Sequence, residues 1–319
     1  MAYLTKKTIN GKRYHYLIKS LRLPDGSQKK IQKLVKNPEN MKALENRYRD
    51  YFIRKEKELY AKYAIEKYKT DPIYTENEIE KLESIRVDYK YLMRKLSEKQ
   101  LKDAFDRFTV NFTYESNAIE GNSLTLKDVA IVLFENATIE GKDLREIYET
   151  RNLRDIMELV RKGRFDINPK DIIKVHKLLM RDMDTPVGYK KVPNYILGKS
   201  VETTPPEKVE SEMSDLIQWY EKSIESIHPL KASAIFHGRF ERIHPFEDGN
   251  GRVGRVLSNV ILMKNKYPPL IIRKSQRLSY LKVLEDYDNG FDWSIKHFFL
   301  KRFKETYRKF FEVYTRYLN

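Results

Sequence analysis

The chain has 319 residues, of which 40% are hydrophobic and 34% charged, with a formal net charge of +16 and no cysteine. A chain of this length and composition can bury the core of one large or two modest domains, which excludes a disordered protein. The lack of cysteine excludes disulfides and thiolate metal sites. No apolar run suits a membrane span or a signal peptide, so we expect a cytoplasmic protein with no membrane partner.

Residues 1–36 predict a small β-meander, in which Asn10-Gly11 is a strong signal for a two-residue hairpin. Tyr14 and Tyr16 alternate with His15 and therefore share one face. Basic, aromatic strands can bind nucleic acid by stacking, and a charge of +16 favours anionic partners. We instead expect the tyrosines to cover a helix, because three short strands need a partner. We interpret the positive charge as a solvated surface spread along the chain.

Helical patterns dominate the rest of the chain, so the predicted fold is mainly α. Asn37-Pro38 has the residues of a helix start, and Asp71-Pro72 ends that helix after about Tyr68. We therefore divide the chain into an N-terminal part, residues 1–70, and a helical part, residues 71–319.

One predicted helix begins at Ser97, which forms a capping box with Gln100, and it continues to Ser116 and Glu120. These last two side chains are four residues apart and share a face, and Gly121 can serve as the C-terminal cap. A glutamate at a helix end most often lies on the surface.

Residues 184–199 interrupt the helical pattern as a hairpin-like excursion. Prolines and glycines bracket Tyr189 and the apolar run Tyr195-Ile196-Leu197. A surface hairpin is the simplest interpretation of this segment.

The chemistry concentrates in residues 244–255, His-Pro-Phe-Glu-Asp-Gly-Asn-Gly-Arg-Val-Gly-Arg. Apolar residues recur at helical spacing before and after this stretch, so it predicts a tight loop between two buried helices. The backbone N–H groups of residues 249–252 would begin the second helix, and such amides beside glycines form an anion site, most often for phosphate. Phe246 is expected to pack inward and to anchor the loop.

The side chains of this loop suit phosphate chemistry. Arg252 and Arg255 are three residues apart, project to the same side and can grip further phosphates. Asp248 is an oxygen ligand of the kind that holds Mg²⁺ together with phosphates. His244 stands at the loop entrance, where an imidazole can take a proton from a hydroxyl.

The stretch matches the pattern His-x-Phe-x-(Asp/Glu)-Gly-Asn-Gly-Arg-x-x-Arg position for position. It resembles the core motif of the Fic/Doc family, specifically the Fic proteins that transfer AMP from ATP to protein hydroxyls. The resemblance covers roughly residues 100–300 and implies a Fic-domain helical core with ATP as substrate and Mg²⁺ as cofactor. A Ser, Thr or Tyr hydroxyl would attack the α-phosphate, with His244 as general base. The implied ATP-binding residues are Asp248, Gly249, Asn250, Gly251, Arg252, Arg255 and Tyr280.

The resemblance extends to two upstream segments. Residues 116–122 look like the inhibitory-helix motif (Ser/Thr)-x-x-x-Glu-(Gly/Asn), in which Glu120, with Ser116, would pair with Arg255 and displace the γ-phosphate. Residues 184–199 look like the flap that aligns the target segment. There Tyr189 and Lys190 stand where relatives carry an aromatic residue and arginine, so the flap match is looser.

Several alternatives stay open. The same scaffold can transfer phosphate or phosphocholine, although Gly251 stands where Doc-like kinases carry lysine. In related enzymes the inhibitory glutamate also assists removal of AMP. A nucleic-acid-binding regulatory protein is the alternative from another class. The target protein is not revealed, and the resemblance leaves self-modification and a homodimer open.

Overall fold

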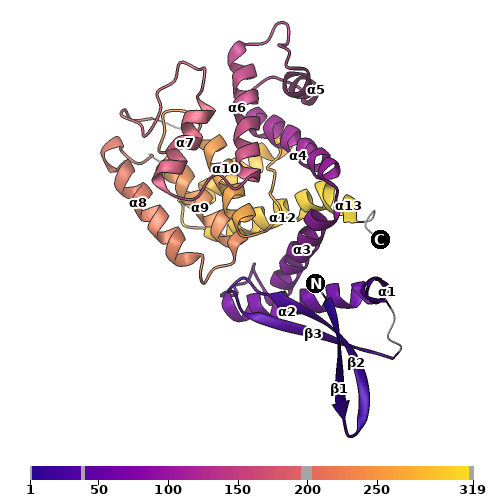
Figure 1. Cartoon of the computed structure of the whole chain (residues 1–319). Coiled ribbons are helices and arrows are strands. Elements are labelled where there is room, and N and C mark those ends of the chain that lie inside the picture. The colour runs from indigo at the N-terminus through magenta and orange to yellow at the C-terminus, as the bar shows by residue number, and fades with distance from the viewer. Residues whose placement is uncertain (1, 37–39, 195–202, 316–319) are drawn as a thin grey trace. The chain divides into compact units, whose positions relative to one another are not determined.

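The computed structural model describes residues 2–36, 40–194 and 203–315, and it confirms a mainly helical fold with a small antiparallel sheet (Figure 1). The chain forms two compact units, Met1–Asp88 and Tyr89–Asn319. Helix α3 (Glu76–Lys95) crosses the division between them. The expected division at residue 70 stays a prediction. Among the described residues, no helix is both long and apolar enough for a membrane span.

The first unit contains the predicted meander, with strands β1 (Ala2–Ile9), β2 (Lys12–Arg22) and β3 (Gln28–Val35) in the order β1-β2-β3. Asn10 and Gly11 have φ of 49° and 75°. A two-residue hairpin with both residues left-handed has a twist that matches the strands. The predicted Asn-Gly hairpin is therefore confirmed.

Helices α1 (Met41–Arg47) and α2 (Arg49–Lys67) cover one face of the sheet. The cluster between them contains Leu17, Ile31, Val35, Leu44 and Phe52. Because side chains alternate along a strand, Tyr14 and Tyr16 lie on the opposite face from Leu17. The expectation that the tyrosines cover the helix is wrong, since the aliphatic side chains do so.

Asn40 caps α1, and Asn37-Pro38, the predicted helix start, lies outside the described residues. The single helix expected up to Tyr68 is interrupted at Tyr48, which is not helical. The capping signal at Ser97 is confirmed, because its side chain accepts a hydrogen bond from the Gln100 N–H.

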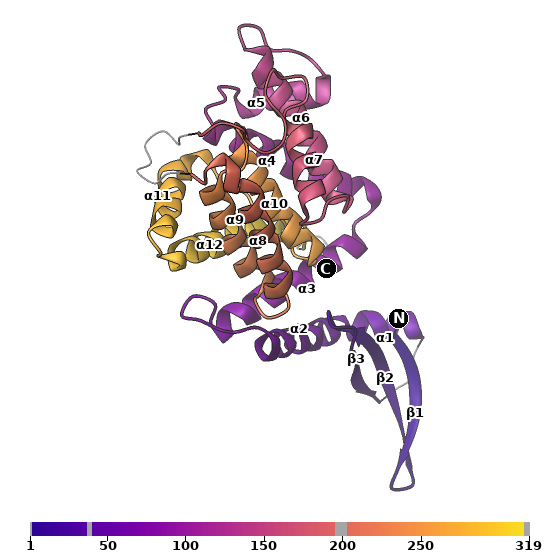
Figure 2. The ribbon, with the colours of Figure 1, turned by 90° about the vertical axis from the view of Figure 1, so that its left-hand side faces the viewer.

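The second unit packs helices around a central pair, α9 (Pro229–Ile243) and α10 (Asn250–Lys264) (Figures 1 and 2). Gly254 on α10 allows this close packing, because a Cβ there would collide with Glu241 and His237 on α9. The elements of this unit, besides the end of α3, are α4 (Glu98–Ile119), α5 (Leu126–Ala130), η1 (Ile131–Glu135), α6 (Leu144–Arg161), α7 (Pro169–Leu179), α8 (Pro206–Ser223), α9 (Pro229–Ile243), α10 (Asn250–Lys264), η2 (Lys274–Gln276), α11 (Arg277–Asp288), α12 (Asp292–Phe310) and α13 (Glu312–Thr315).

Residues 184–194 form bends and irregular segments, without a strand in this described part of the excursion. Tyr195-Ile196-Leu197 and the rest of the predicted flap, to residue 199, lie outside the described residues. The hairpin therefore stays a prediction.

Candidate active site

A tight loop connects α9 to α10, as the motif predicts. His244 ends α9 with a left-handed φ of 52°, and Gly249 precedes α10 with φ of 78°. The Asn250 side chain closes the loop: it accepts a hydrogen bond from the Phe246 N–H (2.9 Å) and donates one to the Phe246 carbonyl (2.8 Å). Both ends of the Asn250 amide thus hold the loop together, and a contact of Asn250 with ATP stays a prediction.

Phe246 anchors the loop, as expected, and its side chain is fully buried. It stacks on His176 of α7, with ring centroids 3.9 Å apart and an interplanar angle of 2°. The Gly188 N–H donates to Nδ1 of His176 (3.3 Å), so Nε2 carries the proton and donates to the Asp248 carbonyl (3.1 Å). Burial lowers the pKa of His176 to about 4, which keeps the ring neutral.

The N-terminus of α10 offers unused backbone donors. Gly249 provides no side-chain cap, and no hydrogen bond between described residues uses the N–H groups of Asn250, Gly251 or Arg252. The first-turn amides of a helix have no partner within the helix and carry partial positive charge. The predicted anion site at the start of α10, here called the phosphate cradle, therefore has the N–H groups of residues 250–252 available as donors.

Arg255 lies beside this cradle, and α4 holds it in place. Its Nη2 donates to Oε1 of Glu120 (2.6 Å) and to the Ser116 carbonyl (3.0 Å), and its Nε donates to Oγ of Ser116 (2.9 Å). The Arg255 side chain is 2% exposed. The structure thus brings together Ser116, Glu120 and Arg255, the three residues expected to interact.

The local charges keep Glu120 ionised. Burial raises the pKa of Glu120. The charge of the Arg255 guanidinium and its hydrogen bond lower this pKa by more than burial raises it, so the pKa lies below its ordinary value. A Cβ on Gly251 would collide with the Glu120 carboxylate. Glycine at position 251 therefore allows the carboxylate to reach the first turn of α10.

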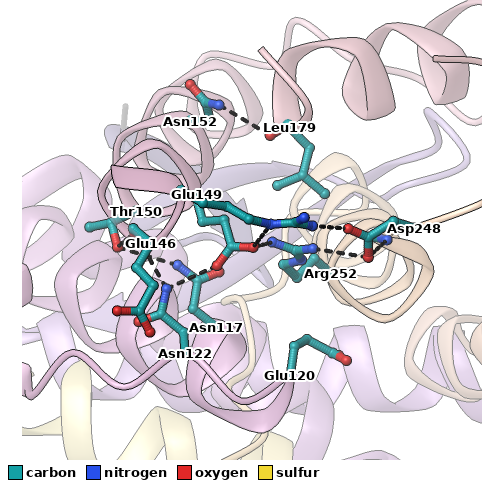
Figure 3. Close-up of polar contacts among 12 residues, drawn as sticks. Asn117, Glu120, Asn122, Glu146, Glu149, Thr150, Asn152, Leu179, Asp248 and Arg252 are labelled. Atoms are coloured by element: carbon teal, nitrogen blue, oxygen red, sulfur yellow. Dashed lines mark hydrogen bonds and ion pairs between the residues drawn. The ribbon is translucent and has the colours of Figure 1, made fainter. Parts of the chain in front are cut away.

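Arg252 is held by Glu149, a residue that the sequence analysis missed (Figure 3). Its Nη1 lies 2.7 Å from Oε1 of Glu149, and its side chain is 2% exposed. The Asn122 side chain donates to the other oxygen of Glu149 (2.9 Å). Figure 3 shows Glu149 between Asn122 and Arg252, whereas Glu120 lies apart from this network. Arg252 therefore points at a carboxylate here.

Asp248 contacts two arginines. One oxygen pairs with Nη2 of Arg145, and the other lies 3.3 Å from Nη2 of Arg252 and accepts from the Gly249 N–H (2.5 Å). No group of three or more His, Asp or Glu side chains in the described part of the chain can hold a metal. A single carboxylate fits Mg²⁺ only when phosphate oxygens complete the shell and Arg145 yields its place.

His244 and Tyr280 differ in accessibility. His244 is half-buried at the entrance of the loop, as the motif predicts. Tyr280 is 2% exposed, its hydroxyl lies 2.8 Å from Nε2 of His237, and its ring centroid lies 5.9 Å from the Arg255 guanidinium carbon. Burial and the Glu241 carboxylate raise the pKa of Tyr280. Tyr280 thus packs beneath Arg255, and its contact with ATP stays a prediction.

Two residues of the predicted flap lie against the motif loop. The Tyr189 ring packs on Phe246, with centroids 5.9 Å apart, and the Lys190 N–H donates to the Pro245 carbonyl (2.8 Å). Nζ of Lys190 is buried and donates to Oδ1 of Asn194 (2.7 Å) and to Oγ1 of Thr203 (2.9 Å). Burial lowers the pKa of Lys190 to about 8. In this structure the Lys190 ammonium therefore holds Asn194 and Thr203 together by hydrogen bonds.

Sequence reasoning missed His176, Arg145 and Glu149. The last two are four residues apart on α6 and form an ordinary helix-surface pair, Nε to Oε1 at 3.4 Å. That spacing gives a weak signal, because it does not reveal what the helix faces. Only the packing of α6 near α10 brings the pair to Asp248 and Arg252.

The fold and the loop define a helical protein with unused backbone amides at the N-terminus of α10, a histidine at the start of the preceding loop and a glutamate paired with Arg255. The model of the Fic/DOC family matches residues 166–262. The chain is 32% identical to a protein adenylyltransferase Fic of Aedes aegypti over 202 residues, which is 60% of this chain and 39% of that protein. It is 30% identical to a protein of the same name from Nematostella vectensis over 196 residues, 60% of this chain and 46% of the other.

A crystal structure of a Fic family protein from Desulfovibrio desulfuricans superposes with a TM-score of 0.65 and 30% identity, covering 77% of this chain and 78% of the other. The chain belongs to the Fic/DOC family. It spans less than half the length of the two curated relatives described above.

Proposed function

We propose that the chain is a protein adenylyltransferase that transfers AMP from ATP to a hydroxyl of a protein. The observation that carries this proposal is the α10 N-terminus, where unused backbone amides lie beside Arg255 and shortly after His244 in the sequence. A triphosphate needs such donors along its length, because charge develops on the phosphates during transfer. The names of the matched relatives agree with this activity.

In this mechanism a hydroxyl oxygen of the target forms a bond to the α-phosphorus of ATP. His244 takes the hydroxyl proton, and the bond from the α-phosphorus to the bridging oxygen breaks, so that pyrophosphate leaves. The N–H groups of residues 250–252 stabilise the charge on the α-phosphate. Arg255 holds the γ-phosphate once Glu120 has moved away.

Asp248 is the residue that would hold Mg²⁺ in this chain, and the ion would neutralise charge on the leaving phosphates. Asp248 is paired with Arg145 in this structure, so it would hold the ion only once that pair had opened. The half-exposed Arg145 side chain can move into solvent, since 49% of its surface is accessible.

Glu120 is proposed as the inhibitory residue. It forms a 2.6 Å ion pair with the arginine that would orient the γ-phosphate, and a carboxylate and a phosphate compete for the same guanidinium. Because the Glu120 side chain is 39% exposed, the pair can open without unfolding of α4.

The test is self-modification and modification of protein extracts with ATP labelled on the α-phosphate. We expect Glu120→Gly to raise incorporation of the label by on the order of 10²-fold, because Arg255 becomes available as a donor to the phosphates. Adding His244→Ala to this variant should lower incorporation by roughly 10²- to 10⁴-fold, the usual contribution of a general base. Glu140→Gly, in an exposed turn, is the matched control and should change nothing.

Equal incorporation of the label by the Glu120→Gly and Glu140→Gly chains would contradict the proposal that Glu120 inhibits transfer. The intact mass of the modified protein distinguishes AMP from phosphate and phosphocholine, which add different masses. A phosphate or phosphocholine adduct would replace adenylylation by another transfer on the same site. Gly251 favours AMP over phosphate transfer, because it stands where Doc-like kinases carry lysine.

A further inference from the structure

The positive charge of this chain is concentrated in its first strands. Residues 1–36 carry ten lysines and arginines against one acidic residue, Asp25, so that their net charge is +9 of the +16 of the whole chain. Residues 37–88 carry eleven lysines and arginines against twelve acidic residues, a net charge of −1. The positive charge is therefore distributed unevenly between these two segments. A local excess of this size attracts a polyanion.

The β1–β2 hairpin presents part of this charge on an open ribbon. Every residue from Lys6 to Arg13 is exposed, and in Figures 1 and 2 the hairpin end extends beyond α1 and α2. Half of these eight residues are cations, namely Lys6, Lys7, Lys12 and Arg13. In the described part of the chain, no acidic side chain forms an ion pair with any of these four.

The register distributes these cations over both sides of the ribbon. Lys6 pairs with His15, whereas its neighbour Lys7 pairs with Tyr14. Successive side chains of a strand point to opposite faces, so Lys6 and Lys7 diverge, as do Lys12 and Arg13. A ribbon that carries cations on both faces can contact phosphates on both walls of a groove.

The geometry favours duplex DNA over other polyanions. The major groove of B-DNA is about 12 Å wide and admits a two-stranded β-ribbon, whereas that of A-form RNA is too narrow and deep. Stacking of single-stranded bases is disfavoured, because Nζ of Lys7 lies over the Tyr16 ring at 5.1 Å from its centroid. We propose that the β1–β2 ribbon, residues 6–13, binds duplex DNA in the major groove, with its four cations contacting phosphates.

The test uses the full-length protein and a fluorescently labelled DNA duplex of random sequence, with binding measured by anisotropy over a range of salt concentrations. The variant replaces Lys6, Lys7, Lys12 and Arg13 with glutamine. We expect its affinity to fall by on the order of 10²-fold at about 0.1 M salt, with a salt slope lower by about 0.9 for each phosphate that the variant no longer neutralises. Binding without sequence preference suffices for this result.

The matched control removes four exposed lysines from the second unit, namely Lys99, Lys170, Lys208 and Lys222, also by glutamine. It lowers the net charge equally and should keep the affinity of the natural chain. A rescue variant that keeps the charge, Lys6→Arg, Lys7→Arg, Lys12→Arg and Arg13→Lys, should also bind. Circular dichroism and thermal melting establish that all variants fold.

Three results would overturn the proposal. The first is equal affinity of the hairpin variant and the matched control. The second is tighter binding of single-stranded DNA or duplex RNA than of duplex DNA. The third is binding to vesicles containing phosphatidylserine that is as tight as binding to the DNA duplex, which would make the ribbon a membrane contact instead. AMP transfer by the Glu120→Gly chain is measured separately. The outcome of the DNA-binding test therefore does not depend on whether the chain transfers AMP.

Discussion

At the scale of single residues, two buried arginines of the motif are each neutralised by a glutamate from another helix. Arg255 pairs with Glu120 of the α4 end, and Arg252 pairs with Glu149 of α6. Removing one partner from a buried pair costs more than the pair contributes, because an uncompensated charge remains. The two pairs differ in exposure: Glu120 is 39% exposed, whereas Glu149 is 11% exposed. Glu120 suits a contact that opens, and Glu149 suits a permanent one.

We expect Glu149→Gln to lower the free energy of unfolding by roughly 3 kcal/mol, since Arg252 then lacks its main counter-charge. Urea denaturation of the purified protein measures this change. Glu158→Gln serves as the control on the same helix, because Glu158 forms a partly exposed pair with Arg161 and is 41% exposed. That pair should contribute at most about 1 kcal/mol. Equal destabilisation of the two variants would contradict a special role for Glu149.

At the scale of elements, residues of the predicted flap support the loop between α9 and α10. The Lys190 N–H reaches the Pro245 carbonyl, and Asn194 donates to the Phe246 carbonyl (2.7 Å). The Lys190 ammonium bonds to Asn194 and Thr203 and so connects the segment to the start of α8. An amine buried among neutral partners loses hydration without gaining a carboxylate, which lowers its pKa.

This burial predicts a dependence of stability on pH. Burial lowers the folded-state pKa of Lys190 to about 8 from an ordinary 10.5. Between these values the unfolded chain binds more protons, so this group makes the fold more stable as pH rises. Relative to Lys190→Met, the natural chain should gain up to about 1.4 kcal/mol per pH unit in that window.

Denaturant unfolding of both chains at pH 7.5 and pH 10 measures this difference. The neighbouring Lys191 is exposed, so Lys191→Met should leave the pH dependence of the natural chain in place. The same pH dependence in all three chains would show that the Lys190 ammonium is solvated in the folded protein.

At the scale of the whole molecule, the charged ribbon and the proposed transfer site lie in different units. Every residue placed at the site falls between Ser116 and Tyr280, within the unit Tyr89–Asn319. We expect a chain of residues 71–319 carrying Glu120→Gly to transfer AMP at the rate of the full-length variant. It should no longer bind duplex DNA.

The truncation also removes packing from α3. Ile79, fully buried, lies in a cluster with Ala64 and Tyr68, which the shortened chain lacks. We therefore expect a lower melting temperature, and the rates must be compared below it. A truncated chain that is folded by circular dichroism yet inactive would show that residues 1–70 contribute to transfer.

The sequence by itself determined the features that depend on neighbours along the chain. The Asn10-Gly11 hairpin, the Ser97 cap, the loop at residues 244–249 and the inward packing of Phe246 follow from local backbone preferences and from apolar periodicity. The pairing of Glu120 with Arg255, 135 residues apart, was expected only because of the family resemblance.

Only the tertiary structure decided which face of the sheet is covered, and it also decided the roles of Asn250, Arg145, Glu149 and His176. In each case the chemistry of the side chain allowed several partners. Arg145 meets Asp248 across 103 residues, and His176 meets it across 72. Such contacts depend on how helices pack, because a helix pattern fixes which side chains share a face but not which element that face meets.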